Sequence, residues 1–236
     1  MSGPVIKVLP GNPLPPAGSA FVDDFSSYPT GAVLPVVAPD RYGPLRRGDW
    51  QSVTVEEAFA PDGRLDKAVR IGEKYQEGGL LTTGAEGVGA GAKLGPERGL
   101  LTTGAEHWTD YRVSFRLKTL ESPFGHIRAR LFLNGAGSRA LEFQIGFDGV
   151  KLVKIAGSQS IILIHRRELE RTGRAVMRDG NWHDFAFELR GDGTVRVFVD
   201  RTEVVNWKDP DYNRGGFGIG PVGVTFQLDD LKVERL

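Results

Sequence analysis

The sequence lacks cysteine, an excess of either charge and any long apolar run. Without cysteine, the 236-residue chain can form neither a disulfide nor a thiolate metal site. Thirty basic residues balance thirty acidic ones, which argues against a nucleic-acid partner because binding to phosphates needs a basic excess. No stretch of about 18 apolar residues is present, so the sequence predicts no membrane-spanning helix.

Glycine and proline are abundant instead. The 32 glycines and 14 prolines allow frequent turns, as a fold of many short strands requires. Hydrophobic residues make up 40% of the chain, which is enough for one sizeable core. We therefore expect a single all-β domain over residues 21–236, preceded by an arm.

Residues 1–20 contain five prolines and lack the apolar helix of a secretory signal. No export signal is visible, so we expect a protein assembled in the cytoplasm. The segment is typical of an extended arm with polyproline character. Two interpretations are open, a mobile tail and an arm that docks on another protein subunit, and we predict the second. The docking residues would be Val5, Ile6, Val8 and Leu9.

The last fifty residues carry the clearest strand pattern. Phe185, Phe187 and Leu189 alternate with polar or small residues, a Gly-Asp-Gly turn follows at 191–193, and three alternating valines come next. This pattern predicts a β-hairpin with one buried face. A second turn and the glycine-rich run 215–220 lead to a last strand predicted over 222–233. We therefore expect the chain to end in an antiparallel meander.

Four motifs mark the two ends of the predicted domain. They are Val-Asp-Asp-Phe at 22–25, Trp-His at 182–183, Val-Arg-Val-Phe-Val-Asp at 195–200 and Leu-Asp-Asp-Leu at 228–231. Together they resemble the first and closing strands of the concanavalin A-like lectin/glucanase superfamily. The resemblance implies an antiparallel jelly-roll β-sandwich in which the first strand pairs beside the last. It is more specific for a fold than for an activity.

The same resemblance implies a candidate calcium site, since such sandwiches often carry a structural ion near the terminal strands. The implied ligands are Asp23, Asp24, Asp229 and Asp230. Carboxylates gathered from two chain ends repel one another unless a cation or a basic side chain offsets them. The alternative is that one aspartate of each pair is a solvated strand residue and the other caps a turn. No other cofactor is expected.

Alternation continues at 111–117, 127–133, 141–145 and 150–155, and predicts strands with one apolar and one polar face. The polar faces would be simply solvated or, as the resemblance implies for the concave sheet of this superfamily, would bind a glycan. The candidates on these strands are His126, Arg128, Arg130, Glu142 and Gln144. Trp207 and Tyr212 flank an Asp-Pro-Asp loop and add candidate aromatic surfaces for a sugar ring.

One eight-residue segment, Gly-Leu-Leu-Thr-Thr-Gly-Ala-Glu, occurs twice, at 79–86 and at 99–106. Chance identity over eight positions is negligible, so we interpret the copies as a tandem duplication. The glycine spacing predicts a projecting loop over about 79–106. This loop is either the product of neutral duplication or a contact loop for a partner.

Motifs for catalysis are missing. Glucanases of the superfamily that the chain resembles carry a Glu-x-Asp-x-x-Glu strand, and no glutamate here has aspartate two residues on. No serine-nucleophile elbow, zinc-binding helix or phosphate loop is present. We therefore predict a non-catalytic structural or adhesive surface component, of which a virion decoration or tail protein is one case. The alternatives are a stand-alone carbohydrate-binding module and a divergent glycoside hydrolase or polysaccharide lyase.

Overall fold

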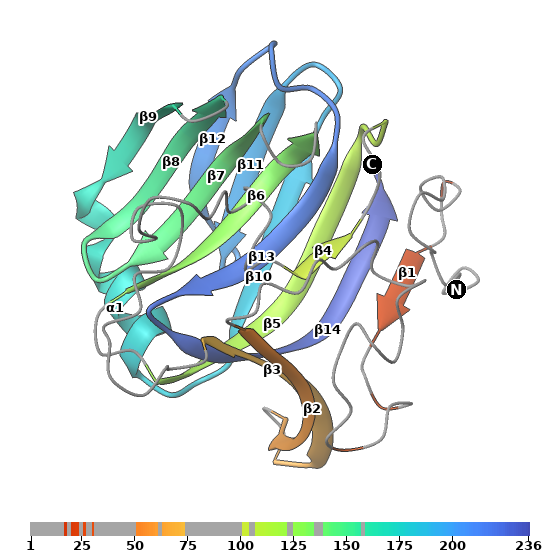
Figure 1. Cartoon of the computed structure of the whole chain (residues 1–236), viewed down its shortest axis with the longest axis vertical. Helices are drawn as coiled ribbons and strands as arrows, with labels where there is room; N and C mark the ends of the chain where they lie inside the picture. Colours follow the sequence, from red (N-terminus) through yellow and green to blue (C-terminus); the bar gives the residue numbers. More distant parts are fainter. Residues whose placement is uncertain are drawn as a thin grey trace, which may run out of the picture.

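Two antiparallel sheets packed face to face make up the part of the chain that the computed structural model describes (Figure 1). The described residues are 20–23, 51–60, 63–73, 101–103, 107–121, 125–134, 139–156 and 159–236, with Ala17, Ser26 and Thr30. The predicted docking residues of the arm, Val5, Ile6, Val8 and Leu9, lie outside this set. The predicted all-β jelly-roll sandwich is confirmed.

The larger sheet, sheet A, has eight strands. Its main path runs β12 (Thr202–Lys208), β11 (Thr194–Val199), β10 (His183–Leu189), β5 (Tyr111–Glu121), β14 (Thr225–Arg235), β3 (Leu65–Glu73) and β2 (Gln51–Phe59), and β1 (Ala20–Asp23) also pairs with β14. The smaller sheet, sheet B, has six strands. They run β4 (Leu101–Thr103), β13 (Gly216–Val222), β6 (His126–Asn134), β7 (Arg139–Gly146), β8 (Gly149–Ala156) and β9 (Gln159–Arg166).

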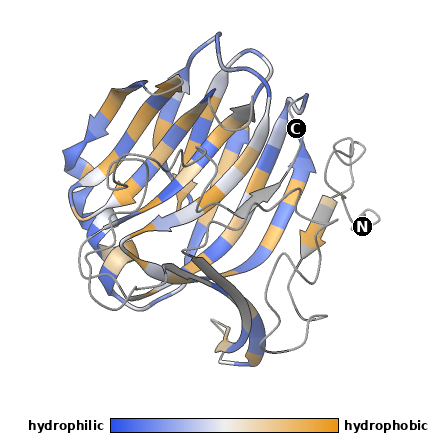
Figure 2. Ribbon diagram, viewed as in Figure 1, coloured by the Kyte–Doolittle hydropathy of each residue, from blue (hydrophilic) through white to orange (hydrophobic). Residues whose placement is uncertain are grey.

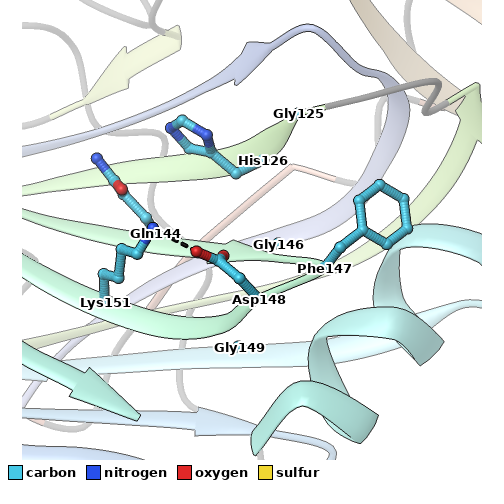
Figure 3. A pocket seen from close by; sticks show the side chains of 8 residues that line it. All are labelled: Gly125, His126, Gln144, Gly146, Phe147, Asp148, Gly149 and Lys151. Carbon is cyan, nitrogen blue, oxygen red and sulfur yellow. Dashed lines mark ion pairs between the residues drawn. The ribbon is translucent and has the colours of Figure 1, made fainter. Parts of the chain in front are cut away.

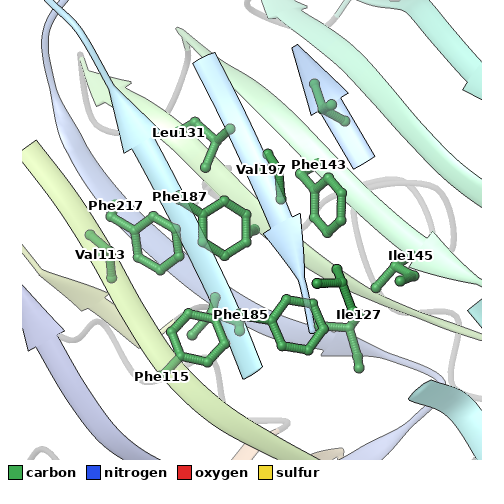
Figure 4. Close-up of a cluster of buried hydrophobic side chains, with 14 of the residues drawn as sticks. Val113, Phe115, Ile127, Leu131, Phe143, Ile145, Phe185, Phe187, Val197 and Phe217 are labelled. Carbon is green, nitrogen blue, oxygen red and sulfur yellow. The ribbon is translucent and has the colours of Figure 1, made fainter. Parts of the chain in front are cut away.

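The core lies between the sheets and is built from side chains that alternate with polar ones along the strands (Figure 2). Phe187 of β10 is at its centre, with its ring 5.0 Å from that of Phe217 on β13 and 5.5 Å from that of Phe143 on β7 (Figure 4). Phe115 and Phe185 stack beside Phe187 at 5.8 and 6.4 Å. Because these rings come from both sheets, they join the two layers of the sandwich.

The first and last strands are neighbours, as the sequence predicts. β1 runs antiparallel to the second half of β14, with Asp23 opposite Leu231. On its other edge β14 pairs with β5 over most of its length. The N-terminal strand thus lies beside β14, on the same edge of β14 as β3.

The end of the chain differs from the prediction. β10, β11 and β12 form a meander in sheet A, but the next strand, β13, lies in sheet B before β14 returns to sheet A. The prediction of one continuous closing meander is therefore wrong. Phe217 and Ile219 of β13 fill the core, and the glycines that alternate with them, Gly216, Gly218 and Gly220, carry no side chain on the outward face. A glycine-rich strand of this kind has the same sequence pattern as a turn, which is why the sequence did not predict it as a separate strand.

Part of the duplicated segment belongs to a sheet. In the second copy, Leu101–Thr103 form β4, which pairs with residues 217–219 of β13 at the edge of sheet B. This portion of the predicted projecting loop is therefore an edge strand. The first copy lies outside the described residues.

A short helix connects β9 of sheet B to β10 of sheet A. A 3-10 turn covers Arg167–Leu169, and α1 covers Glu170–Arg178. Gly173 of α1 lies against the turn between β7 and β8, where an added Cβ would be 2.0 Å from the carbonyl oxygen of Gly146. Only glycine allows this close approach. None of the described helices has the length and apolar character needed to cross a membrane.

Replacing Phe187 with alanine should lower the free energy of unfolding by about 3–5 kcal/mol, because it removes a buried ring and leaves a cavity. Urea denaturation measures this loss. Phe59→Ala is the matched control, since the Phe59 side chain is 66% exposed and its removal should change the unfolding free energy by less than about 0.5 kcal/mol. Equal effects of the two substitutions would contradict the central position of Phe187.

Candidate functional site

Polar side chains gather on the outward face of β6, β7 and β8 in sheet B. The intervening residues of β6 are buried in the core, so the alternate ones point outward. The strand register places Arg130 opposite Glu142, Arg128 opposite Gln144, and Gln144 opposite Lys151. We call this surface the sheet B polar face, and it consists of His126, Arg128, Arg130, Glu142, Gln144 and Lys151.

Five of the seven predicted ligand-binding residues are therefore brought together, and glycines on β13 leave room for two of them. Gly218 lies opposite Arg130, and Gly220 lies opposite Arg128. Because neither glycine has a side chain, the long arginine side chains are not blocked by the neighbouring strand. The glycines of β13 thus make room for the polar face, while its apolar residues pack in the core.

A buried ion pair lies within the sheet B polar face. Nε of Arg130 donates to Oε2 of Glu142 at 3.0 Å, and the two side chains are 9% and 7% exposed. Nε2 of Gln144 donates to the other carboxylate oxygen at 2.7 Å. Burial by itself raises the pKa of Glu142, but Arg130, Arg128 and the hydrogen bonds outweigh burial and hold this pKa below its usual range. Glu142 is therefore an ionised acceptor fixed by two donors.

A pocket of about 310 Å³ opens at one end of the sheet B polar face, beside the turn between β7 and β8 (Figure 3). His126, Gln144 and Lys151 line it from three neighbouring strands, and Phe147 and Asp148 of the turn line it as well. Nζ of Lys151 lies 2.5 Å from Oδ2 of Asp148. Burial acts to raise the pKa of Asp148, but the hydrogen bond and charge of Lys151 lower it overall. The wall of the pocket therefore contains an ion pair in which the charges of Lys151 and Asp148 offset each other.

His126 is neutral in this pocket at ordinary pH. Burial, opposed by Glu142 and assisted by Arg128 and Lys151, lowers the pKa of His126 from 6.5 to about 4. A neutral imidazole has one donor and one acceptor, and the amide of Gln144 offers both as well. Such a set suits a ligand rich in hydroxyl groups, because each hydroxyl both donates and accepts.

Trp207 and Tyr212 lie away from the sheet B polar face. Trp207, on the edge strand β12 of sheet A, is half-buried and packs against the core. Tyr212 is only 4% exposed, and its hydroxyl donates to the carbonyl oxygen of Ile155 at 2.6 Å. The structure therefore does not bring these two candidates together with the other five.

The aspartates near the end of β14 are arranged around an arginine. Nη2 of Arg116 lies 3.0 Å from Oδ2 of Asp229 and 2.7 Å from Oδ2 of Asp230. Burial raises the pKa of Asp229 to about 6 although Arg116 opposes this rise. Asp23 is on β1, and Asp24 is outside the described residues. No group of three His, Asp or Glu side chains in the described part is placed to hold a metal ion, and Arg116 supplies positive charge beside Asp229 and Asp230.

Besides its three glycines, the pocket has three lining residues that were not predicted from the sequence, namely Lys151, Phe147 and Asp148. Lys151 is one of the alternate residues that the strand predicted over 150–155 would point outward, so the alternation pattern could have identified it. Phe147 and Asp148 form the turn between two glycines. Alternation does not determine where the side chains of a turn point.

Several solved structures share this architecture at low sequence identity. The cellulose induced protein Cip1 matches with a TM-score of 0.53 at 12% identity, over 92% of this chain and 97% of that one. The fold is the concanavalin A-like jelly roll. Two weaker matches are the carbohydrate-binding module CBM66 of Bacillus subtilis (12% identity, TM-score 0.46, 81% of this chain and 100% of that one) and the β-glucanase of Bacillus licheniformis (11%, 0.45, 93% and 99%). No protein-family model and no curated protein matches the sequence.

The low pKa of His126 predicts that the domain loses stability in mild acid. The folded state binds this proton only near pH 4, whereas the unfolded chain binds it near pH 6.5, so falling pH favours unfolding between these values. Above pH 6.5 His126 is neutral in both the folded and the unfolded state, so it does not change the free energy of unfolding. By pH 4 its protonation in the unfolded state lowers this free energy by roughly 3 kcal/mol. Urea denaturation from pH 4 to 7 should therefore show a steeper decline for the wild type than for His126→Gln. Parallel curves would contradict the low pKa.

Proposed function

We propose that the chain is a non-catalytic glycan-binding domain that uses the sheet B polar face and its pocket as the ligand site. The observation that carries this proposal is the position of His126, Gln144 and Lys151, which line one pocket from three neighbouring strands. Because paired strands hold these groups in place, little freedom is lost when a ligand binds. The domain would act as an adhesive or structural surface component.

The chemistry of the pocket fits sugar hydroxyls better than a charged ligand. Lys151 is already paired with Asp148, so an anion would have to compete with this carboxylate. Neutral His126 and Gln144 can each donate and accept a hydrogen bond. Phe147 also lines the pocket, but its ring packs against the core and the guanidinium of Arg178 lies 4.5 Å from its centroid, so only part of the ring faces a ligand. A neutral glycan therefore suits chiefly the polar part of the wall.

The outward face of β7 favours binding over hydrolysis. Alternate residues share one face of a strand, and a retaining glycosidase needs two carboxylates about 5 Å apart. After Glu142, the next outward positions on β7 are Gln144 and Gly146, and neither is an acid. Glu142 itself is tied to Arg130 and has a lowered pKa, so it is a poor general acid. These features support the binding role against the glycoside hydrolase alternative.

Two parts of the sequence-based hypothesis stay predictions. They are assembly with other subunits through the N-terminal arm and a setting on a virion. Both concern what the domain is attached to. The glycan site concerns the domain alone, so it can be tested on the isolated chain.

Gln144→Ala and Lys151→Ala should each weaken glycan binding by about tenfold, because each substitution removes one fixed hydrogen-bonding group. The wild type is first screened on a printed array of neutral glycans. The dissociation constant for the best ligand is then measured by isothermal titration calorimetry for each variant. The same ligand should remain uncleaved after long incubation, as judged by chromatography.

Lys208→Ala is the matched control. Lys208 is also paired with an aspartate, at 2.7 Å from Asp192, but it lies on β12 of sheet A. Its removal should leave the affinity unchanged. The proposal fails if the wild type binds no arrayed glycan, or if Lys208→Ala weakens binding as much as Lys151→Ala. Cleavage of the ligand would refute the non-catalytic role.

A further inference from the structure

The outward face of sheet A carries a second hollow, on the side of the sandwich opposite to the sheet B polar face. Its volume is about 650 Å³, and residues of five strands line it. One row of lining residues is aligned by the strand register, and it consists of Phe198, Ala186, Ser114, Lys232 and Val22. Neighbouring strands are about 4.8 Å apart, so this row spans roughly 19 Å. We call this hollow the sheet A groove.

Small side chains form the floor of the sheet A groove. Ala186 of β10 and Ser114 of β5 lie opposite each other in the middle of the row. Arg112 of β5 lines one side of the hollow. It is paired at 3.2 Å with Glu188 of β10, which also lies 3.4 Å from Arg196 of β11. The hollow therefore follows from a short row of side chains beside a long one.

The opposite wall is also polar. Asp184 of β10 lies opposite Arg116 of β5, and Nη2 of Arg116 is 2.7 Å from Oδ2 of Asp230. The planar groups of these side chains can each make two hydrogen bonds in one plane. Both walls therefore offer donors and acceptors to a ligand in the groove.

An aromatic ring closes one end of the row. Phe198 of β11 lies outside the core cluster and is partly exposed. The pairing of β11 with β12 shifts register between Val197 and Phe198, which marks a β-bulge. Bulges re-aim side chains and are enriched next to functional sites. The guanidinium groups of Arg196 and Arg112 lie 4.9 and 5.9 Å from the centroid of this ring, so part of its surface is already covered. The part of the ring that remains open to the hollow is a surface against which a sugar ring can pack.

The cations that line the sheet A groove are largely offset by carboxylates. Three of them have acidic partners, in the pairs Arg112–Glu188, Arg116–Asp229, Arg116–Asp230 and Lys232–Glu234. An anionic ligand would have to compete with these carboxylates. A neutral ligand would not, because paired guanidinium and carboxylate groups keep further donors and acceptors. The charge balance therefore favours a neutral ligand.

We propose that the sheet A groove binds a linear neutral oligosaccharide, with one sugar ring stacked on Phe198 and hydroxyl groups bonded to the two walls. The length of the row favours a chain of sugars over a single ring. This site goes beyond the proposed function because it shares no residue with the sheet B polar face. A domain with both sites joins two glycan chains from opposite sides.

The test uses the full chain with Gln144→Ala and Lys151→Ala combined, which removes pocket groups of the sheet B site and leaves the groove intact. Binding of cellohexaose, laminarihexaose and xylohexaose is measured by isothermal titration calorimetry. At least one of them should bind with one site per chain. Adding Phe198→Ala should weaken this binding by about tenfold. Adding Ser114→Trp, which fills the floor, should abolish it.

Phe59→Ala in the same background is the matched control, because Phe59 is an exposed phenylalanine of sheet A outside the groove. It should leave the affinity unchanged, and thermal melts establish that each variant is folded. If Ser114→Trp does not fold, Phe198→Ala decides the question. The proposal is overturned if none of the three hexasaccharides binds the background variant, or if Phe198→Ala binds as tightly as its parent. Because the sheet B site is already impaired, failure here leaves the proposed function standing.

Discussion

The two sheets depend on each other through the phenylalanine rings that lie between them. Phe187 comes from sheet A, and Phe143 and Phe217 come from sheet B, so the contact among these rings determines which residues of each strand point inward. It also determines which point outward, since side chains alternate along a strand. A slip of one residue in β6 would exchange Ile127 for Arg128 and place a guanidinium in the core. The two polar outer faces are therefore a consequence of the packing inside.

The outer faces use the same kind of ion pair in different surroundings. On sheet B, Arg130 and Glu142 are 9% and 7% exposed, so loss of either partner would remove the directly bonded opposite charge of a buried group. On sheet A, Glu188 is also buried, at 10% exposure, but its partner Arg112 is 37% exposed, so solvent screens part of their attraction. Because separating these buried charges is unfavourable, Arg130 and Glu142 stay in place. In the second pair only Arg112 reaches solvent, so this arginine can move more easily than Arg130.

Period-two alternation was enough to predict most of the strands and five of the six residues of the sheet B polar face, all but Lys151. It grouped Arg130 with Glu142 correctly because β6 and β7 are consecutive in the chain and simply pair with each other. Alternation did not predict β13, because glycines such as Gly218 are typical of turns. Nothing in the local sequence shows that an arginine of the neighbouring strand β6 occupies the space beside this glycine. Alternation also could not identify Arg116 as a partner of Asp229, because 113 residues separate them. Such contacts follow from topology, which local patterns do not contain.

The glycines of β13 make the ligand surface of sheet B adjustable without a change of architecture. Gly218 and Gly220 face outward beside Arg130 and Arg128, while Phe217 and the other inward residues of the strand hold the core. A small side chain at either glycine would keep the strand but would crowd the neighbouring arginine. Substitutions at Gly218 and Gly220 could therefore change which ligand sheet B prefers. The need to fold would constrain mainly the inward residues of β13.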